Sequence, residues 1–291
     1  MSSRSPYLVG LIGNGVRPSL TPPLHMAEAA ALGLDYVYRP IDLLEHDLPA
    51  TAIGDLLRQA RVFGLDALNV THPCKQLVIE HLDTLSPAAA ALGAVNTVLF
   101  EPDGRTTGHN TDTTAFETSV RTALPGASLA QVVMLGAGGA GAAVADALAR
   151  LGTERLAVVD VDQTRAAALA TELAERHAAT HVESAPHDEL SALLATATGV
   201  VHCTPTGMAD HPGLPFDAVL LHPRLWVADI VYRPLDTALL QAARAAGCRT
   251  LDGGHMAVHQ AVDAFRLITG IDPDVDRMSR HFRTLVADDE A

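Results

Sequence analysis

Aromatic and cationic side chains are scarce in this 291-residue sequence. Aromatic residues make up 4% of the chain although 48% is hydrophobic, so alanine, leucine and valine must fill most of the core of a globular protein. Lysine and arginine together number 20, against 34 aspartate and glutamate residues, and the formal net charge is −14. An acidic surface repels phosphate backbones, so we expect no nucleic-acid partner.

Features that mark other protein classes are also missing. The three cysteines, Cys74, Cys203 and Cys248, lie far apart without paired metal spacing, which is typical of a reducing compartment. The sequence has no apolar leader and no run of about 18 apolar residues, so we expect a cytoplasmic protein that contacts no membrane. Neither a G-x-S-x-G elbow nor a G-x-x-x-x-G-K-[ST] loop occurs, which disfavours a hydrolase or a P-loop kinase.

Short β-branched runs alternate with Ala/Leu-rich stretches along the chain. This alternation is the signature of βαβ units and predicts an α/β fold with two domains. We expect residues 1–112 and 256–291 to form a substrate-binding domain, to which the C-terminal helices return, and residues 113–255 to form a Rossmann-type dinucleotide-binding domain. We predict strands at 7–13, 36–43, 65–71, 155–160, 199–208 and 225–232, a hairpin over 94–112, and helices ending at Leu34 and at 51–63, 113–123, 163–177, 235–246, 256–269 and 273–287.

The stretch GAGGAG, residues 136–141, matches the G-x-G-x-x-G pattern of dinucleotide-binding proteins. A predicted strand, QVVML, precedes it and a predicted helix, AAVADALAR, follows it. The first two glycines permit a tight turn and a close approach to a pyrophosphate, and the third lets the helix pack against the strand. The alternative is that the glycines only close a turn. We predict a cofactor contact for Gly136, Ala137, Gly138, Gly139, Ala140 and Gly141.

Asp160 ends the second strand of this unit, 24 positions after the first glycine of the motif. An acidic group there accepts hydrogen bonds from the adenosine ribose hydroxyls and repels the 2′-phosphate of NADP. Val161 offers that phosphate no cation, so the sequence predicts NAD as the cofactor. Asp162 is expected to cap the following helix. Arg165, one turn further on, is expected to be solvated, with a cofactor contact as the alternative.

Small hydroxyl and amide side chains, with single charges, follow several predicted strands of the flanking domain. They occur in SLTP (19–22), NVTHPCK (69–75), AVNT (94–97) and GHNTD (108–112). Hydroxyls and amides donate and accept hydrogen bonds, as the hydroxyl groups of a polyol require. Ser19 and Thr21 point the same way in an extended segment, so we expect them to hold a carboxylate.

These motifs, with GAGGAG and the closing HQAVDAF, resemble the shikimate dehydrogenase family over nearly the whole chain. The chain is most similar to the NAD-dependent quinate/shikimate dehydrogenase branch, because biosynthetic NADP-dependent members usually carry S-K-S-P and N-R-T-x-x-R where this chain has S-L-T-P and Asp160–Val161–Asp162. The resemblance implies reversible hydride transfer that converts quinate or shikimate, both cyclic polyol carboxylates, to 3-dehydroquinate or 3-dehydroshikimate. Two alternatives stay open: a strict shikimate or aminoshikimate dehydrogenase of a biosynthetic pathway, and a non-catalytic ligand sensor. The sequence does not indicate the oligomeric state.

The resemblance also implies roles for particular residues. Lys75 and Asp112 match the catalytic pair of the family. A lysine takes a hydroxyl proton only where a neutral amine is available or the proton passes onward, and a nearby carboxylate favours the ammonium. Asp112 is therefore expected to orient Lys75 and to bind a substrate hydroxyl. Substrate contacts are implied for Ser19, Thr21, Thr71, Lys75, Asn96, Asp112, Tyr232 and Gln260, and further cofactor contacts for Arg165, Thr204, Gly207, Met208, Gly253 and Met256.

Histidine and cysteine residues next to these motifs each have two interpretations. The family often has G-x-G-M where this chain reads G-G-H-M, so His255 is expected near the cofactor or the substrate. A metal pair of His255 and His259 lacks a third ligand, and no metal is expected. Cys74 is expected to fill space, with a reactive thiolate as the alternative.

Overall fold

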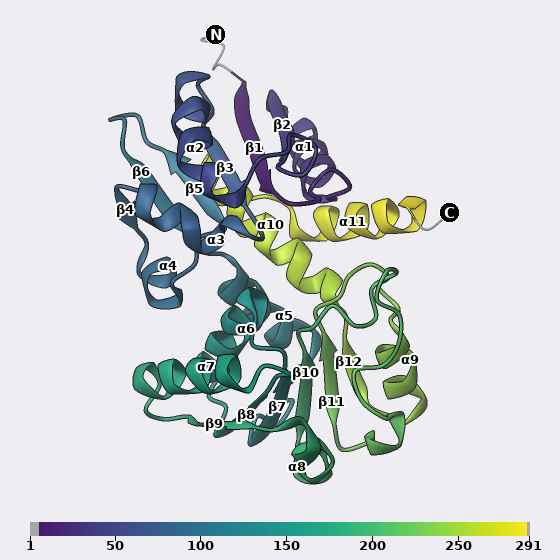
Figure 1. Ribbon diagram of the computed structural model, residues 1–291. Coiled ribbons are helices and arrows are strands. Elements are labelled where there is room, and N and C mark those ends of the chain that lie inside the picture. The colour runs from purple at the N-terminus through teal and green to yellow at the C-terminus, as the bar shows by residue number, and fades with distance from the viewer. Residues whose placement is uncertain (1–5, 290–291) are drawn as a thin grey trace. The chain divides into compact units, whose positions relative to one another are not determined.

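The computed structural model describes residues 6–289, so the outermost residues of the predicted first domain, 1–5 and 290–291, lie outside the described part. The chain forms two compact units. One comprises the residues up to Thr111 together with Gln260–Ala287, and the other comprises Asp112–His259 with the residues from Asp288 onward. Each unit is built around its own six-stranded sheet (Figure 1). The second boundary falls inside α10 (Gly253–Thr269), which contributes to both units.

The sheet of the first unit is mixed, with the order β2-β1-β3-β5-β6-β4. β1, β2 and β3 are parallel, β5 is antiparallel to both β3 and β6, and β4 is parallel to β6. The carboxyl ends of β1, β3 and β6 therefore lie at the same edge as the amino end of β5, and the predicted hairpin is confirmed. The strands are β1 (Tyr7–Gly13), β2 (Tyr36–Asp42), β3 (Ala67–Val70), β4 (Thr84–Leu85), β5 (Thr97–Phe100) and β6 (Thr106–His109).

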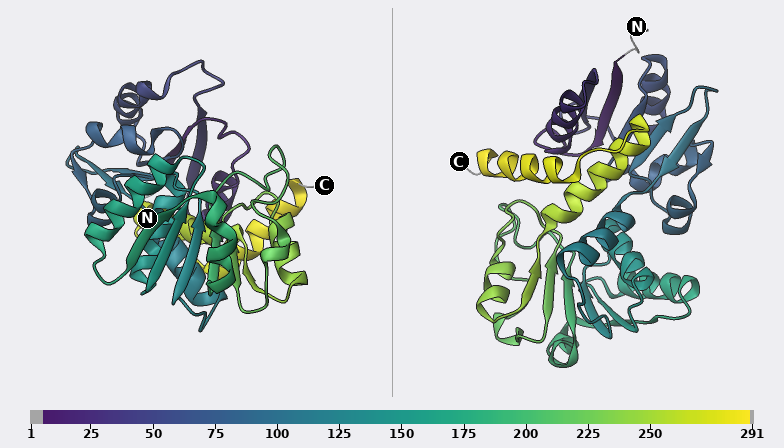
Figure 2. Two further views of the ribbon diagram at one scale, coloured as in Figure 1. Left: turned by 60° about the horizontal axis from the view of Figure 1, so that its bottom comes forward. Right: turned by 180° about the vertical axis from the view of Figure 1, so that it is seen from behind.

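Helices cover both faces of this first sheet. Along β1, Val9 and Leu11 pack on one face with Tyr38, whereas Ile12 packs on the other face with Ile53 and its neighbours in α2, as the period of two in a strand dictates. Figure 2 shows α11 running past α1. An ion pair between Arg277 of α11 and Glu28 of α1 holds the two helices together. The helices are α1 (Thr21–Ala31), α2 (Ile53–Val62), α3 (Cys74–Leu77), α4 (Pro87–Leu92), α10 and α11 (Val275–Asp289), with 3-10 turns η1 (Ala50–Ala52) and η2 (Val78–His81).

The sheet of the second unit is wholly parallel, with the order β12-β11-β10-β7-β8-β9. This is the doubly wound order of dinucleotide-binding domains, and its direction reverses between β7 and β10. Val132 and Met134 of β7 pack under α5, α6 and α7, and Val133 and Leu135 pack under α8 and α9 on the opposite face. The predicted two-domain α/β fold is thus confirmed.

The elements of the second unit follow in strict alternation. The predicted strand at 199–208 was too long, because β10 ends at His202 and the chain turns through Gly207, whose φ is +97°. Among residues 6–289, none of the helices has the length and apolar character that a membrane span needs. The elements are α5 (Asp112–Ala123), β7 (Gln131–Leu135), α6 (Gly139–Arg150), β8 (Arg155–Val159), α7 (Gln163–Arg176), β9 (His181–Ala185), η3 (His187–Glu189), α8 (Leu190–Thr196), β10 (Gly199–His202), η4 (Ala218–Leu220), β11 (Trp226–Asp229), α9 (Ala238–Ala245) and β12 (Arg249–Leu251).

Candidate functional site

The glycine-rich loop between β7 and α6 requires glycine at positions 136 and 141. Gly136 has φ +100°, and a Cβ placed there would lie 2.7 Å from the carbonyl oxygen of Cys203. A Cβ on Gly141 would lie 2.1 Å from the carbonyl oxygen of Gly136. Gly138 and Gly139 instead face open space at the start of α6. Because the first N–H groups of a helix lack intrahelical partners, this open loop suits the pyrophosphate of a dinucleotide.

Asp160 lies directly after β8 and is only 6% exposed. Its Oδ2 accepts a hydrogen bond from the backbone N–H of Ala137 at 2.6 Å, and its Oδ1 accepts one from the N–H of Asp162 at 2.8 Å. Burial acts to raise the pKa of this carboxyl, but the hydrogen bonds from Arg165 and from the two backbone N–H groups outweigh burial and lower the pKa below its usual value. Asp160 is therefore an anchored carboxylate beside the glycine-rich loop.

Arg165 is exposed, as the sequence predicted, but it also pairs with Asp160. Its Nη2 donates to Oδ1 of Asp160 at 2.7 Å, and its Nε donates to Oδ2 of Asp160 at 3.3 Å. The pairing forms because α7 begins directly after β8, with Asp162 capping it through Oδ1 as predicted. The guanidinium stays half-exposed, so one carboxylate and one cation stand together where the adenosine ribose is expected.

The loop after β10 lies against the glycine-rich loop. The Cγ2 of Thr204 is 3.0 Å from the position that a Cβ on Gly136 would take. Further along, the N–H of Gly207 donates to the carbonyl of His211, and the N–H of Met208 donates to the carbonyl of Pro205. The predicted cofactor residues of this loop therefore belong to one turn structure beside the switch point between β7 and β10.

The start of α10 packs against the segment that follows β11. A Cβ on Gly253 would lie 2.4 Å from the carbonyl oxygen of Ile230, so no larger residue fits there. Tyr232 lies in the same segment, and burial raises the pKa of its hydroxyl. Met256 packs against the core on the α5, α6 and α7 face. His255 lies beside Asp252, with its Nδ1 3.2 Å from the carboxylate Oδ1.

Asn96 is the centre of a buried polar network at the edge of the first sheet where β3 ends and β5 begins. Its Nδ2 donates to Oγ1 of Thr111 at 2.9 Å, and its Oδ1 accepts from the N–H of Thr111 at 3.1 Å. Thr111 in turn donates through Oγ1 to the backbone carbonyl of Gln260 at 3.2 Å. The structure thus joins Asn96, which precedes β5, to Gln260 in α10.

Thr71 and Lys75 follow β3 at the same edge. The methyl group of Thr71 lies over Gly13, where a Cβ would approach it to 2.4 Å. The backbone carbonyl of Lys75 accepts a hydrogen bond from the N–H of Val95 at 2.8 Å, next to Asn96 in the chain. Lys75 is the only lysine in the sequence, and it is partly buried.

The geometry predicted for Ser19 and Thr21 was wrong, since the segment is not extended. Thr21 is the first residue of α1, because Pro22 and Pro23 favour the first helical turn. The two residues are nevertheless adjacent, and the N–H of Thr21 donates to Oγ of Ser19 at 3.3 Å.

Sequence reasoning missed the residue that shapes the loop before Ser19. Oδ1 of the buried Asp42 accepts from the N–H groups of Gly15 and Leu44, and Oδ2 accepts from that of Arg17. Burial acts to raise the pKa of Asp42, but these hydrogen bonds prevail and lower it. The available signal was the position of Asp42, an aspartate between the apolar residues Ile41 and Leu43 at the end of a predicted strand.

Asp112 is buried and begins α5 in the second unit, whereas Lys75 belongs to the first unit. Because the two residues belong to different units, their pairing stays a prediction. Cys74 packs in the core of the first unit, and burial raises the pKa of its thiol, which confirms the space-filling role. Within residues 6–289, no group of three or more His, Cys, Asp or Glu side chains is placed to hold a metal ion.

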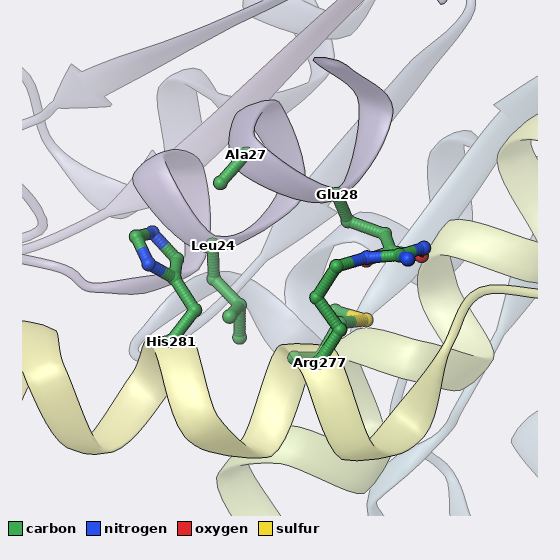
Figure 3. Close-up of a pocket in the computed structure, with 6 residues that line it drawn as sticks. Leu24, Ala27, Glu28, Arg277 and His281 are labelled. Atoms are coloured by element: carbon green, nitrogen blue, oxygen red, sulfur yellow. The ribbon is translucent and has the colours of Figure 1, made fainter. Parts of the chain in front are cut away.

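A small pocket lies between α1 and α11 of the first unit. Figure 3 shows Arg277 reaching toward Glu28, and the guanidinium binds both carboxylate oxygens at 2.7 Å. The N–H of Asp274 donates to the same carboxylate. The buried carboxylate of Glu28 is therefore fully paired. The volume of the pocket is about 180 Å³, and it is lined by Leu24, Ala27, Glu28, Arg277, Met278 and His281.

The fold and the glycine-rich loop define a dinucleotide-binding protein. The model of the shikimate dehydrogenase substrate-binding domain matches residues 11–98, and that of the saccharopine dehydrogenase NADP-binding domain matches residues 132–209. A shikimate dehydrogenase (NADP(+)) of Pseudarthrobacter chlorophenolicus is 56% identical over 291 residues, covering 100% of this chain and 99% of the relative. The chain belongs to the shikimate dehydrogenase family.

Relatives with another cofactor in their names are also similar. A quinate/shikimate dehydrogenase (NAD(+)) of Corynebacterium efficiens is 49% identical, covering 96% of this chain and 98% of the relative. The solved quinate dehydrogenase from Corynebacterium glutamicum in complex with NAD superposes with a TM-score of 0.91 at 46% identity, covering 96% of this chain and 99% of that one. A nicotinamide dinucleotide is therefore the cofactor class.

Proposed function

We propose that the protein catalyses the reversible NAD-dependent oxidation of quinate to 3-dehydroquinate and of shikimate to 3-dehydroshikimate. The observation that carries the choice of NAD is the anchored carboxylate of Asp160, whose oxygens accept from ribose hydroxyls in place of the half-exposed Arg165 guanidinium and whose negative charge repels a 2′-phosphate. The next residue, Val161, is 89% exposed and supplies no cation. The Corynebacterium relatives named for NAD support the same choice.

When bound, the dinucleotide supplies the hydride acceptor. We assign to Nζ of Lys75 the proton that leaves the ring hydroxyl as the carbonyl forms, and to Asp112 the orientation of that amine. The hydroxyls and amides of Thr71, Asn96 and Gln260 bind the remaining substrate hydroxyls, and Tyr232 lines the substrate pocket. Ser19 and Thr21 hold the substrate carboxylate.

A second candidate is an NADP-dependent shikimate dehydrogenase. Two observations favour it: the 56% identical relative is named for NADP, and the half-exposed guanidinium of Arg165 stands beside Asp160. The contacts there still favour NAD, because the ion pair with Asp160 already engages the guanidinium that a 2′-phosphate would need.

Product analysis tests the substrate assignment. The protein is incubated with excess NAD and either quinate or shikimate, and the acids are separated and identified by mass. We expect 3-dehydroquinate from quinate and 3-dehydroshikimate from shikimate. Turnover of shikimate alone would contradict the quinate assignment, and binding of both acids without turnover would indicate a sensor.

A further inference from the structure

Three side chains form a buried hydrogen-bonded chain at the ends of β10 and β11. His202 is 0% exposed and Asp229 is 2% exposed. Nδ1 of His202 lies 3.0 Å from Oδ1 of Asp229, and Nε2 of His202 lies 2.5 Å from Oγ1 of Thr204. The segment after β10 is therefore tied through one imidazole to the neighbouring strand.

The positions of the protons follow from the partners. Asp229 also accepts from Oγ1 of Thr237 at 2.7 Å and from the N–H of Val231 at 3.0 Å, so as an acceptor it requires the proton of His202 on Nδ1. Oγ1 of Thr204 accepts from the N–H of Thr206 at 3.3 Å. Oγ1 of Thr204 is therefore held from two sides, by the ring of His202 and by the N–H of Thr206.

The anchored threonine begins the loop that faces the cofactor cradle. Asp160 follows β8 on one side of Gly136, whereas Thr204 follows β10 on the other side and approaches Gly136 closely. A dinucleotide with its pyrophosphate on the glycine loop and its adenosine at Asp160 must place its nicotinamide half on the β10 side. The loop from Thr204 to Met208 follows β10 and lies on that side.

We propose that His202, held by Asp229, is a positioning residue that fixes Thr204 and its loop for the nicotinamide half of the cofactor. The role rests on the proposed dinucleotide function. His202 is not itself catalytic, because its fully buried ring gives neither nitrogen to a substrate. For the same reason the Asp–His–Thr arrangement does not serve as a hydrolytic triad, whose histidine must reach a leaving group.

Binding of NAD and of ADP-ribose, which lacks the nicotinamide, tests the role. Calorimetry on the full chain compares the wild type with His202→Leu, Thr204→Val and Thr204→Ser. We expect His202→Leu and Thr204→Val each to weaken NAD by about tenfold while ADP-ribose binding stays unchanged. Thr204→Ser, which keeps the hydroxyl, should weaken NAD clearly less than Thr204→Val, and the double variant His202→Leu/Thr204→Val should lose no more than the larger single loss, because both changes break one chain.

The outcomes separate this role from the proposed function. Equal losses of NAD and ADP-ribose, additive losses in the double variant, or an unaltered Thr204→Val would overturn the positioning role alone. If His202→Leu does not fold, the Thr204→Val and Thr204→Ser pair decides by itself. Failure of the wild type to bind either ligand would overturn the dinucleotide function and the positioning role with it.

Discussion

The backbone N–H of Ala137 donates a 2.6 Å hydrogen bond to Oδ2 of Asp160, which joins the glycine-rich loop to the end of β8. The glycine-rich loop and the proposed ribose acceptor are therefore held in one arrangement by a bond within the protein. A change at Asp160 should alter both the choice of cofactor and the shape of the loop that receives it.

Replacing Asp160 with asparagine should shift the preference from NAD toward NADP. The amide offers fewer acceptors to the ribose and does not repel a 2′-phosphate, and it releases Arg165. Hydrogen bonds to a charged group are worth ~1.5–3 kcal/mol, so kcat/KM with NAD should fall by roughly 10–100-fold. Asp162→Asn, in the same turn, is the matched control and should keep the wild-type ratio. An unchanged ratio in Asp160→Asn would remove Asp160 from cofactor selection.

Replacing Arg165 with glutamine separates the two cofactor assignments. Since the guanidinium pairs with Asp160 in this structure, its loss should leave kcat/KM with NAD within about threefold, as for other exposed ion pairs. Any activity with NADP should decrease, because the nearest cation is gone. Steady-state kinetics with both cofactors measure this, and a collapse of activity with NAD would mean that Arg165 holds NAD directly.

Replacing Lys75 should lower kcat much more than it weakens substrate binding. General base catalysis contributes about 10²–10⁴-fold, so we expect losses of this size for Lys75→Ala. Lys75→Arg is the sharper control, because arginine keeps the positive charge but cannot become a neutral base. Retained activity in Lys75→Arg would show that the charge, and not proton transfer, is what matters.

The single lysine also permits a chemical test without mutation. An amine-directed reagent can modify only Lys75 and the chain's amino terminus. We expect modification to abolish turnover and quinate to protect against it. Mass spectrometry of the modified peptide identifies the site, and full activity with Lys75 modified would contradict the assignment.

Thr21→Val should raise KM for both quinate and shikimate by roughly 3–10-fold with little change in kcat, since it removes one hydrogen bond to the shared carboxylate. Thr51→Val changes an exposed threonine in η1 and serves as the control. Steady-state kinetics provide the readout. An unaltered KM for both acids would place the carboxylate elsewhere.

His25 should make the first unit sensitive to acid. Burial lowers the pKa of His25 from 6.5 to about 3, so the unfolded chain binds a proton between these values that the folded chain does not. Stability should therefore fall as pH decreases below 6.5, by about 2 kcal/mol between pH 7 and pH 5. Urea unfolding at both pH values should show a smaller decrease for His25→Phe than for the wild type. The exposed His46→Gln is the control, and an identical decrease in His25→Phe would contradict the assignment.

Local rules explain what the sequence predicted correctly. The glycines at 136 and 141 are required by a positive φ and by close backbone contacts, and β7 has apolar residues on both faces because helices cover both. The sequence patterns that report these features, G-x-G-x-x-G and an apolar strand, are each local in the chain, so the dinucleotide fold could be inferred directly. The hairpin of β5 and β6 was equally local.

Contacts between distant residues could not be inferred in this way. The pairing of Arg165 with Asp160 depends on the direction in which α7 leaves β8. The sequence places Arg165 one turn into an exposed helix, which predicted only contact with solvent. His202 and Asp229 meet only because β10 and β11 are neighbours in the sheet. The segment at Ser19 looked extended because its two prolines also fit an extended chain, yet they start α1.

The most direct test is the ratio of kcat/KM for NAD to that for NADP, measured with quinate at saturation by absorbance of the reduced nicotinamide. An anchored, negatively charged Asp160 predicts a ratio well above one, by about tenfold or more. A ratio below one would contradict the proposed NAD-dependent oxidation of quinate and would favour the NADP-dependent shikimate dehydrogenase.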